Sequence, residues 1–455
     1  MPESEIFVTL PQMLAARETR VFRQQALLAQ YHAPLVCFTM NIAGPIKNSP
    51  LIRRGFRLGC RDLENALRRD GAAVLHKEIT DAATGNEAFY AVDMDPLRLK
   101  KLTAELEDAA PMARLFDMDV LDENGEKIDR TALALPVRRC LLCGAPAKEC
   151  ARSRRHTVAE LQAKTTELLQ TALDEHDAET IAQQATRALL FEVTTTPKPG
   201  LVDRRNTGSH RDMDSFTFMS SAAVLYPYFK KCAEQGLRDA AESRPAADTF
   251  AALRPLGRKA ESEMLAATNG VNTHKGAIFS IGIAAAALGR VSPDRRSDPA
   301  AVLDECAAIT AGLVSRDYAG LTKAETAGQR FFLQYGITGV RGQAEAGFPA
   351  VRSVGLPTLE AGLNQGLGND RAGAAALLAM LCADDDTNML ARGGRAEQLR
   401  AANRVAALLD ETPYPDEQAL ERLDDEFIRK NLSPGGSADL LALCWLLHFF
   451  KTEAL

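Results

Sequence analysis

Residues 158–176, VAELQAKTTELLQTALDEH, mark the point where the sequence changes character. They are rich in alanine and leucine and read as a helix. Similar segments follow repeatedly, in ETIAQQATRALLFEV, DTFAALRPLGRKAESEMLAAT, KGAIFSIGIAAAALGR, GAAALLAMLCADDD and SADLLALCWLLHFF. Signals for strands nearly vanish after about Thr157. The sequence therefore predicts an all-α region that runs to the end of the chain.

The residues before this point read differently. PLVCFTMNI, AAVLHKEI, EAFYAVDMD and ARLFDMDVLD are short runs that predict strands, whereas DPLRLKKLTAELEDA predicts a helix. Together they indicate an α+β domain. We expect a multidomain chain, with an N-terminal α+β domain over residues 1–160 and a helical domain over residues 161–455.

Composition limits the class of protein. With 455 residues, 46% hydrophobic and 25% charged, the chain suits two or three globular domains. The net charge of −6 argues against a general nucleic-acid binder. The longest apolar runs are too short to span a membrane, and the acidic N-terminus lacks the signature of a signal peptide. We expect a cytoplasmic protein with no membrane or nucleic-acid partner.

Residues 194–214, TTTPKPGLVDRRNTGSHRDMD, follow a helical segment and themselves contain almost no apolar residues. A Pro-Lys-Pro-Gly turn precedes a mixture of cations, anions, Asn, Ser and His. The stretch suits either a polar loop with internal salt bridges or a cradle for phosphates.

Two further polar clusters precede helices. In GVNTHKG, Asn272 or Thr273 is the expected N-cap, and His274 and Lys275 fall in the first turn. Cations there oppose the helix dipole, so a bound anion would account for them. In SPGGSAD, Ser437 is the expected cap of the last helix. Each cluster is either an ordinary cap or an anion-binding helix end.

The segment GAAALLAMLCADDDTNMLARGG predicts one helix that ends at Gly393 and Gly394. At helical spacing Asp385, Asn388 and Arg392 share a face. Three consecutive acids in the later turns repel one another, so compensation by Mg²⁺ or arginine is expected. A solvated polar end is the alternative.

Residues 326–351 contain five glycines together with Arg330 and Arg341. Flexible backbone and guanidinium groups suit phosphate binding, although this spacing is weak by itself.

Five separated blocks now resemble one family. TPKPGLVDRRNTGSHRDMD, GVNTHKG, YGITGVRGQAEAGFP, DTNMLARGG and SPGGSADLLA resemble, in this order, triphosphoribosyl-dephospho-CoA synthase. The resemblance covers about residue 157 to the C-terminus. It departs at Gln343, where an acid is expected, which puts a metal-binding role for that position in doubt.

The resemblance implies a reaction between ATP and dephospho-CoA. The 2′-hydroxyl of dephospho-CoA attacks the anomeric carbon of the ATP ribose, adenine leaves and the triphosphate stays attached. Such chemistry needs a polyphosphate cradle, Mg²⁺ on carboxylates, and a base for the hydroxyl proton. The expected phosphate-binding residues are Lys198, Arg204, His210, His274, Lys275, Arg341, Asn388, Arg392 and Ser437. Metal or base roles are expected for Asp203, Asp212, Asp214 and Asp385.

In the N-terminal part, VCFTMNIAGPIKNSP offers Lys47 as a phosphate-binding residue, or as a plain surface lysine after a turn. In ARLFDMDVLD, Asp117 and Asp119 leave the same face of a strand. Such carboxylates repel unless a divalent cation bridges them, as in nucleotidyl transfer. Asp93 and Asp95 repeat the spacing but suit N-caps better.

With RETRVFRQ and the Cys/Arg stretch, these blocks resemble holo-citrate lyase synthase over about residues 10–160. The resemblance implies a nucleotidyltransferase-like domain that transfers the phosphoribosyl-dephospho-CoA unit to a serine of the citrate lyase acyl carrier protein, with loss of pyrophosphate. Two alternatives stay open: the equivalent pair for malonate decarboxylase, and a helical scaffold that binds nucleotide without turnover.

One cysteine cluster stands apart. Six of the nine cysteines are scattered and suit buried, reduced positions, but RRCLLCGAPAKECARSRRH gathers Cys140, Cys143, Cys150 and His156. The first two have zinc-like spacing, and the others follow too closely for a common zinc finger. Structural zinc is therefore not expected here. The surrounding arginines and lysine could steer an acidic carrier protein or grip a triphosphate.

Overall fold

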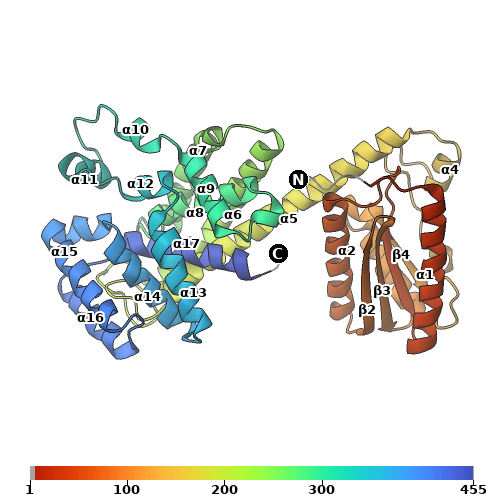
Figure 1. Cartoon of the computed structure of the whole chain (residues 1–455), viewed down its shortest axis with the longest axis horizontal. Helices are drawn as coiled ribbons and strands as arrows, with labels where there is room; N and C mark the ends of the chain where they lie inside the picture. Colours follow the sequence, from red (N-terminus) through yellow and green to blue (C-terminus); the bar gives the residue numbers. More distant parts are fainter. Residues whose placement is uncertain (1–5, 454–455) are drawn as a thin grey trace. The chain divides into compact units, whose positions relative to one another are not determined.

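The structure, a computed structural model, describes residues 6–453. The chain divides into two compact units, residues 1–175 and 176–455, and the division falls inside the long helix α5 (Val158–Thr194). Figure 1 shows a small sheet with helices in the first unit and helices in the second. Helix α5 contains both VAELQAKTTELLQTALDEH and ETIAQQATRALLFEV, which the sequence predicts as two separate helical segments.

The first unit is built on a four-stranded antiparallel sheet in the order β2-β3-β1-β4. The strands are β1 (Leu35–Met40), β2 (Ala73–Ala82), β3 (Gly85–Asp93) and β4 (Phe116–Leu121). All four expected strands are confirmed. The helices are α1 (Leu10–Tyr31), α2 (Pro50–Arg69), α3 (Pro96–Asp108) and the short α4 (Ala147–Arg152).

Alternation along β1 decides which helix covers which face of the sheet. Val36 and Phe38 point into the main core with Phe56 of α2 and Leu99 of α3. Leu35 and Cys37 point the other way, into a smaller core with Leu27 and Leu28 of α1. The sheet therefore lies between α1 on one face and α2 and α3 on the other (Figure 1).

The second unit is helical throughout the described residues. Its helices after α5 are α6 (Ser215–Ala241), α7 (Ala246–Ala267), α8 (Lys275–Arg290), α9 (Pro299–Thr310), α10 (Leu313–Tyr318), α11 (Ala327–Tyr335), α12 (Gly339–Glu345), α13 (Leu356–Asn364), α14 (Gly368–Ala383), α15 (Thr387–Glu411), α16 (Glu417–Arg429) and α17 (Gly435–Thr452).

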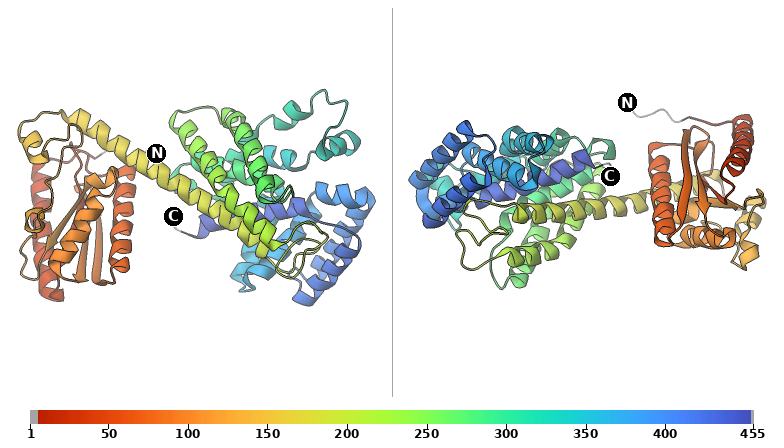
Figure 2. Two further views of the ribbon diagram at one scale, coloured as in Figure 1. Left: turned by 180° about the vertical axis from the view of Figure 1, so that it is seen from behind. Right: turned by 90° about the horizontal axis from the view of Figure 1, so that it is seen from below.

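Three of these helices form the centre of the unit. Helices α8, α14 and α17 are buried over most of their length, as expected from their apolar composition. Helix α17 packs against α8 and α14, while α6 and α7 cover α8 (Figure 2). Loops at the starts of α6, α8, α15 and α17 carry the polar clusters. Within residues 6–453, no helix is both long and apolar enough to cross a membrane.

The predicted single helix around the three acids is wrong. Helix α14 ends at Ala383, and Asp386 is the N-cap of a new helix, α15, which continues past a kink at Gly394. Three adjacent carboxylates are unfavourable at the negative end of a helix, whereas one of them gains hydrogen bonds from the amides that begin the next helix. Asp385 therefore does not share a helical face with Asn388 and Arg392.

Candidate active sites

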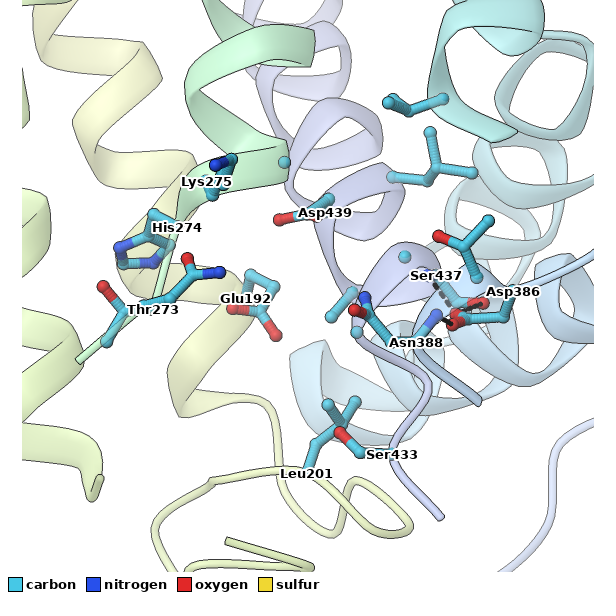
Figure 3. A pocket seen from close by; sticks show the side chains of 18 of the residues that line it. Glu192, Leu201, Thr273, His274, Lys275, Asp386, Asn388, Ser433, Ser437 and Asp439 are labelled. Atoms are coloured by element: carbon cyan, nitrogen blue, oxygen red, sulfur yellow. Dashed lines mark hydrogen bonds between the residues drawn. The ribbon is translucent and has the colours of Figure 1, made fainter. Parts of the chain in front are cut away.

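A cavity of about 380 Å³ lies in the helical unit where α8, α15 and α17 begin. Segments far apart in the sequence line it, as Figure 3 shows. Of the residues expected from the sequence, the cavity is lined by Lys198, His210, Asp212, His274, Lys275, Asp385, Asn388, Arg392 and Ser437. Gln343, at which the resemblance departs, lines it too.

Lys198, which lines this cavity, has a partner within the protein. It is only 1% exposed, and its Nζ forms an ion pair with the buried carboxylate of Glu192. A buried ammonium group requires a nearby negative charge, which explains the pairing. Burial also raises the pKa of Glu192, although Lys198 opposes that shift. Any phosphate would have to share Lys198 with Glu192.

Asp386 connects two helix starts. One of its oxygens accepts hydrogen bonds from the backbone nitrogens of Asn388 and Met389, at 2.9 and 3.1 Å. The other accepts from the backbone nitrogen and hydroxyl of Ser437, at 2.8 and 3.1 Å. Ser437 lies within the first turn of α17 rather than at its N-cap, which is Pro434. The expected cap role of Ser437 is therefore wrong.

Asp439 lies on the cavity wall, one turn into α17 and close to the start of α8 (Figure 3). Its pKa is raised well above the ordinary value by burial, by Glu192 and by Asp386, while a hydrogen bond from the backbone of Ala277 opposes the shift. Glu192, Asp386 and Asp439 thus place several carboxylates at one cavity with Lys198 as the nearby buried cation.

His274 is the N-cap of α8, so the expected cap at Asn272 or Thr273 is wrong. Its Nδ1 lies 2.7 Å from the hydroxyl of Ser221, and its buried Nε2 has no hydrogen-bond partner within the described chain. Burial, together with the charge of Lys198, lowers the pKa of His274 to about 3. The imidazole is therefore neutral at physiological pH, so Lys275 is the one of the two expected cations that is charged at this helix start.

A second group of side chains closes another part of the cavity. Arg392 donates to the carbonyl of Ser209 at 2.8 Å and approaches Nδ1 of His210 at 3.0 Å. The Nε2 of His210 lies 2.9 Å from the hydroxyl of Ser433. Burial and Arg392 lower the pKa of His210. The structure thus brings His210 and Arg392 together from segments that are 182 residues apart.

Several expected residues have other roles. Asp214 is the N-cap of α6, accepting from Thr217, and Asp203 accepts from three backbone amides of its own loop. Neither lines the cavity, so their expected metal or base roles do not fit this geometry.

Arg204 and Arg341 also lie outside the cavity wall. Arg204 pairs with Asp370 at 2.5 Å, and Arg341 pairs with Asp317 at 2.9 Å beside a neighbouring hollow. Lys275 lines both hollows, and its Nζ pairs with Glu261.

The first unit has a smaller, polar cavity of about 160 Å³ at one end of the sheet. Arg17, Arg20, Asn41, Lys47 and Asp117 are among its lining residues. Burial and the neighbouring Arg17 lower the pKa of Lys47. Cationic and carboxylate groups therefore meet in one small hollow.

Asp117 and Asp119 share the sheet face that carries Cys37 and Thr39, as the register of β1 and β4 shows. Arg138 lies 3.0 Å from Asp117, and Lys127 lies 2.6 Å from Asp119. Burial and the charge of Asp119 raise the pKa of Asp117. Each carboxylate thus has a cationic side chain beside it, and Asp119 is not among the residues that line the cavity. Asp95 is the N-cap of α3, as predicted, whereas Asp93 is the last residue of β3 and not an N-cap.

Comparison with known proteins matches both units to transferase families. Residues 178–454 match the ATP:dephospho-CoA triphosphoribosyl transferase family, and residues 8–172 match the apo-citrate lyase phosphoribosyl-dephospho-CoA transferase family. A protein of Haemophilus influenzae named Protein CitXG is 38% identical over 98% of this chain and 97% of its own length. The chain belongs to the CitXG family.

Two other relatives support this assignment. Protein CitXG of Leuconostoc mesenteroides subsp. cremoris is 33% identical over 96% of both chains. The 2-(5''-triphosphoribosyl)-3'-dephosphocoenzyme-A synthase of Pectobacterium atrosepticum is 41% identical over 60% of this chain and 90% of its own. The two resemblances seen in the sequence are thus confirmed.

In this CitXG-family chain the sequence analysis missed Glu192 and Asp439 as cavity residues. Each is a single acid beside apolar residues, in LLFEV and ADLLAL. An isolated acid in such a run is the one signal that could have indicated them, because a buried carboxylate needs a polar partner. Gln343 lies beside Asp384, to which it donates a hydrogen bond that opposes the raised pKa of that acid.

Proposed function

We propose that the helical unit makes triphosphoribosyl-dephospho-CoA from ATP and dephospho-CoA. The 2′-oxygen of dephospho-CoA forms a bond to the anomeric carbon of the ATP ribose, and the bond from that carbon to adenine breaks. A carboxylate takes the hydroxyl proton, and adenine leaves with the electron pair of the broken bond and gains a proton, so that no net proton is released. The meeting of three helix starts and several carboxylates at one cavity supports this proposal most directly.

Several groups that line the cavity have a part in this proposal. His210, Arg392 and Lys275, with the cavity-lining backbone at Gly435 and Gly436, bind the polyphosphate. Asn388 lies on the same wall and offers an amide. Asp212 and Asp385 keep their proposed catalytic roles, and Asp385 is held by Arg395 and Gln398. The raised pKa of Asp439 makes it a further candidate for the proton acceptor.

The donor groups of this cavity suit Mg²⁺. Carboxylate and amide oxygens are its usual protein ligands, and it commonly keeps bonds to water and to substrate phosphates. Burial raises the pKa of Asp439, and the charges of Glu192 and Asp386 raise it further, so a cation beside Asp439 would stabilise its charged form. When bound, Mg²⁺ would neutralise charge on the triphosphate.

For the first unit we propose a nucleotidyltransferase-like reaction on the product of the second. A serine oxygen of the citrate lyase acyl carrier protein attacks the α-phosphorus, and pyrophosphate leaves. Lys47, Arg17 and Arg20 hold phosphate oxygens, and Asp117 with Asp119 serves the hydroxyl or a metal ion. The family description, which names apo-citrate lyase, favours this carrier over that of malonate decarboxylase.

The exposed cations around α4 could bind the citrate lyase acyl carrier protein if its surface is acidic. Arg139, Lys148, Arg152, Arg154 and Arg155 are exposed, whereas Arg138 pairs with Asp117. The proposed domain limits remain residues 1–160 and 161–455, with α5 running across them.

Crossed assays test the two proposals separately. Asp385→Ala should lower adenine release from ATP and dephospho-CoA by about 10²–10⁴-fold, as expected for a catalytic carboxylate. It should leave transfer from preformed triphosphoribosyl-dephospho-CoA unchanged. Asp117→Asn should show the opposite pattern.

Asp410→Ala and Asp93→Asn are exposed controls for the two assays. Full adenine release by Asp385→Ala would remove that residue from the proposed site. No adenine release by the unaltered protein would contradict the proposed reaction itself.

A further inference from the structure

The Cys/His cluster is the feature of the first unit that the proposed reactions do not use. Single ligand atoms of Cys140, Cys143, Cys150 and His156 all lie within 4.8 Å of one another. The sequence spacing is too tight for a common zinc finger. The fold nevertheless brings the four side chains together. Cys140 and Cys143 lie on a turn, Cys150 lies on α4, and the chain after α4 returns His156 to the three cysteines.

The sulfur separations have the size that a metal centre requires. The sulfur of Cys150 lies 3.5 Å from that of Cys140 and 3.9 Å from that of Cys143. Zinc–sulfur bonds of about 2.3 Å at tetrahedral angles place two sulfurs about 3.8 Å apart. A disulfide would require sulfurs about 2.05 Å apart. The separations therefore fit thiolates around one ion.

The turn that carries the first two cysteines is built to support charged sulfur. The backbone nitrogen of Leu142 lies 3.5 Å from the sulfur of Cys140 and donates to it. Gly144, with φ of +69°, follows Cys143, and its nitrogen donates to the carbonyl of Cys140 at 3.3 Å. Arg139 and Pro146 form a β-bridge across the turn. An amide donor to sulfur stabilises a thiolate ligand.

His156 supplies the fourth group. Its Nε2 is buried and lacks a hydrogen-bond partner among residues 6–453. A buried ring nitrogen without a partner is costly unless it binds something. Three thiolates and one imidazole form a complete set for tetrahedral zinc, with no position left for a substrate.

We propose that Cys140, Cys143, Cys150 and His156 bind a structural zinc ion that fixes the loop after β4. That loop contacts the proposed transfer site. Arg114 donates to the carbonyls of Arg139 and Cys140, each at 3.0 Å, and Arg138 lies 3.0 Å from Asp117. The zinc holds Arg138, a positioning residue, against Asp117.

The test uses the full chain, purified with reductant and without added metal. Elemental analysis should find one zinc per chain. Cys143→Ser removes an exposed ligand, so the fold is least disturbed, and zinc affinity should fall by more than about 100-fold, since loss of an outer partner alone costs about 10–100-fold. Cys382→Ser, an exposed cysteine outside the cluster, is the matched control and should keep its zinc.

Cobalt gives a second measurement that needs no variant. Co²⁺ added to metal-free protein should produce the intense visible bands of a tetrahedral ion and a thiolate charge-transfer band.

Any of four results would overturn the proposal: a protein that binds neither metal, iron in place of zinc, unchanged zinc in Cys143→Ser, or a Cys140–Cys150 disulfide in reduced protein. Removal of zinc with a zinc-selective chelator, followed by assay in excess Mg²⁺, should lower transfer to the carrier protein while adenine release stays unchanged, which separates this site from the proposed active sites. Equal loss of both activities would contradict the positioning role of the zinc.

Discussion

The carboxylate of Asp386 binds Ser437 through both its backbone nitrogen, at 2.8 Å, and its hydroxyl, at 3.1 Å, while it also caps its own helix. One side chain thus joins the starts of α15 and α17, and Asp386 and Ser437 are 51 residues apart in the sequence. The contact places the polar ends of two helices at the same cavity and leaves Asp386 only 4% exposed.

Asp386→Ala should lower the free energy of unfolding by about 2–3 kcal/mol, because a cap and buried charge-assisted hydrogen bonds are lost together. Asp416→Ala is the matched control, since Asp416 caps α16 with one exposed hydrogen bond to the nitrogen of Ala419. That change should cost about 1 kcal/mol. Urea denaturation measures both. Equal costs would show that the link to Ser437 contributes nothing.

The buried pair of Lys198 and Glu192 gives a second prediction. Lys198→Met leaves a buried carboxylate without its cation and should lower the free energy of unfolding by about 3–5 kcal/mol. Adding Glu192→Gln should restore much of that stability, because the unpaired charge is removed. Denaturation of the single and double variants measures their coupling.

The exposed pair of Lys164 and Glu167 is the control, and Lys164→Met should change stability by no more than about 0.5 kcal/mol. A small effect of Lys198→Met would mean that Glu192 is neutral in the folded protein.

How much the sequence could predict depends on how local each signal is. The strand of Asp117 and Asp119 was predictable, because alternation within six residues determines it. The break between Asp384 and Asp386 was not, because it depends on Ser437, which lies far along the chain. The composition predicts the apolar helices. The end of α14 at Ala383 depends on the hydrogen bonds between Asp386 and Ser437 of α17, which composition does not show.

The site followed the same rule. Polar clusters at helix starts indicated the cavity, since loops between apolar helices rarely carry so many charges without a use. Glu192 and Asp439 could not be identified as cavity residues from the sequence, because only the packed structure brings them to the cavity. The grouping of the cysteine cluster could not be predicted, because spacing alone does not show that the fold brings single ligand atoms of all four residues within 4.8 Å of one another.

His274 gives a prediction of pH dependence. Its pKa falls from an ordinary value of 6.5 to about 3 in the folded protein, because burial and Lys198 disfavour the charged ring. The unfolded chain therefore binds the proton more readily, so this group makes stability fall as pH decreases below about 6.5. Between about pH 7 and about pH 5 the loss should be about 2 kcal/mol.

Denaturation of the unaltered protein and of His274→Gln at both pH values measures this difference. The variant should lose less stability over the interval, by the same amount. The carboxylates with raised pKa, including Glu192, Asp386 and Asp439, act in the opposite direction, but they are present in both proteins. Parallel pH profiles would show that His274 is charged or accessible in the folded state.

Gly276 tests whether the position of Asp439 matters for the reaction. A Cβ on Gly276 would lie 1.9 Å from Oδ2 of Asp439, so Gly276→Ala must push that carboxylate away from the start of α8. Since only the end of a side chain moves, the fold should persist, while adenine release should fall by more than about 10-fold if Asp439 binds metal or accepts the proton.

Gly257→Ala is the control within a helix, because its Cβ would meet the hydroxyl of Tyr228 at an ordinary 3.6 Å. It should stabilise α7 by about 0.5–1 kcal/mol and leave adenine release unchanged. Thermal denaturation and the adenine assay distinguish the two changes. Full activity in Gly276→Ala would show that Asp439 can leave its place without cost to catalysis, and the proton acceptor would then have to be sought among Asp212 and Asp385.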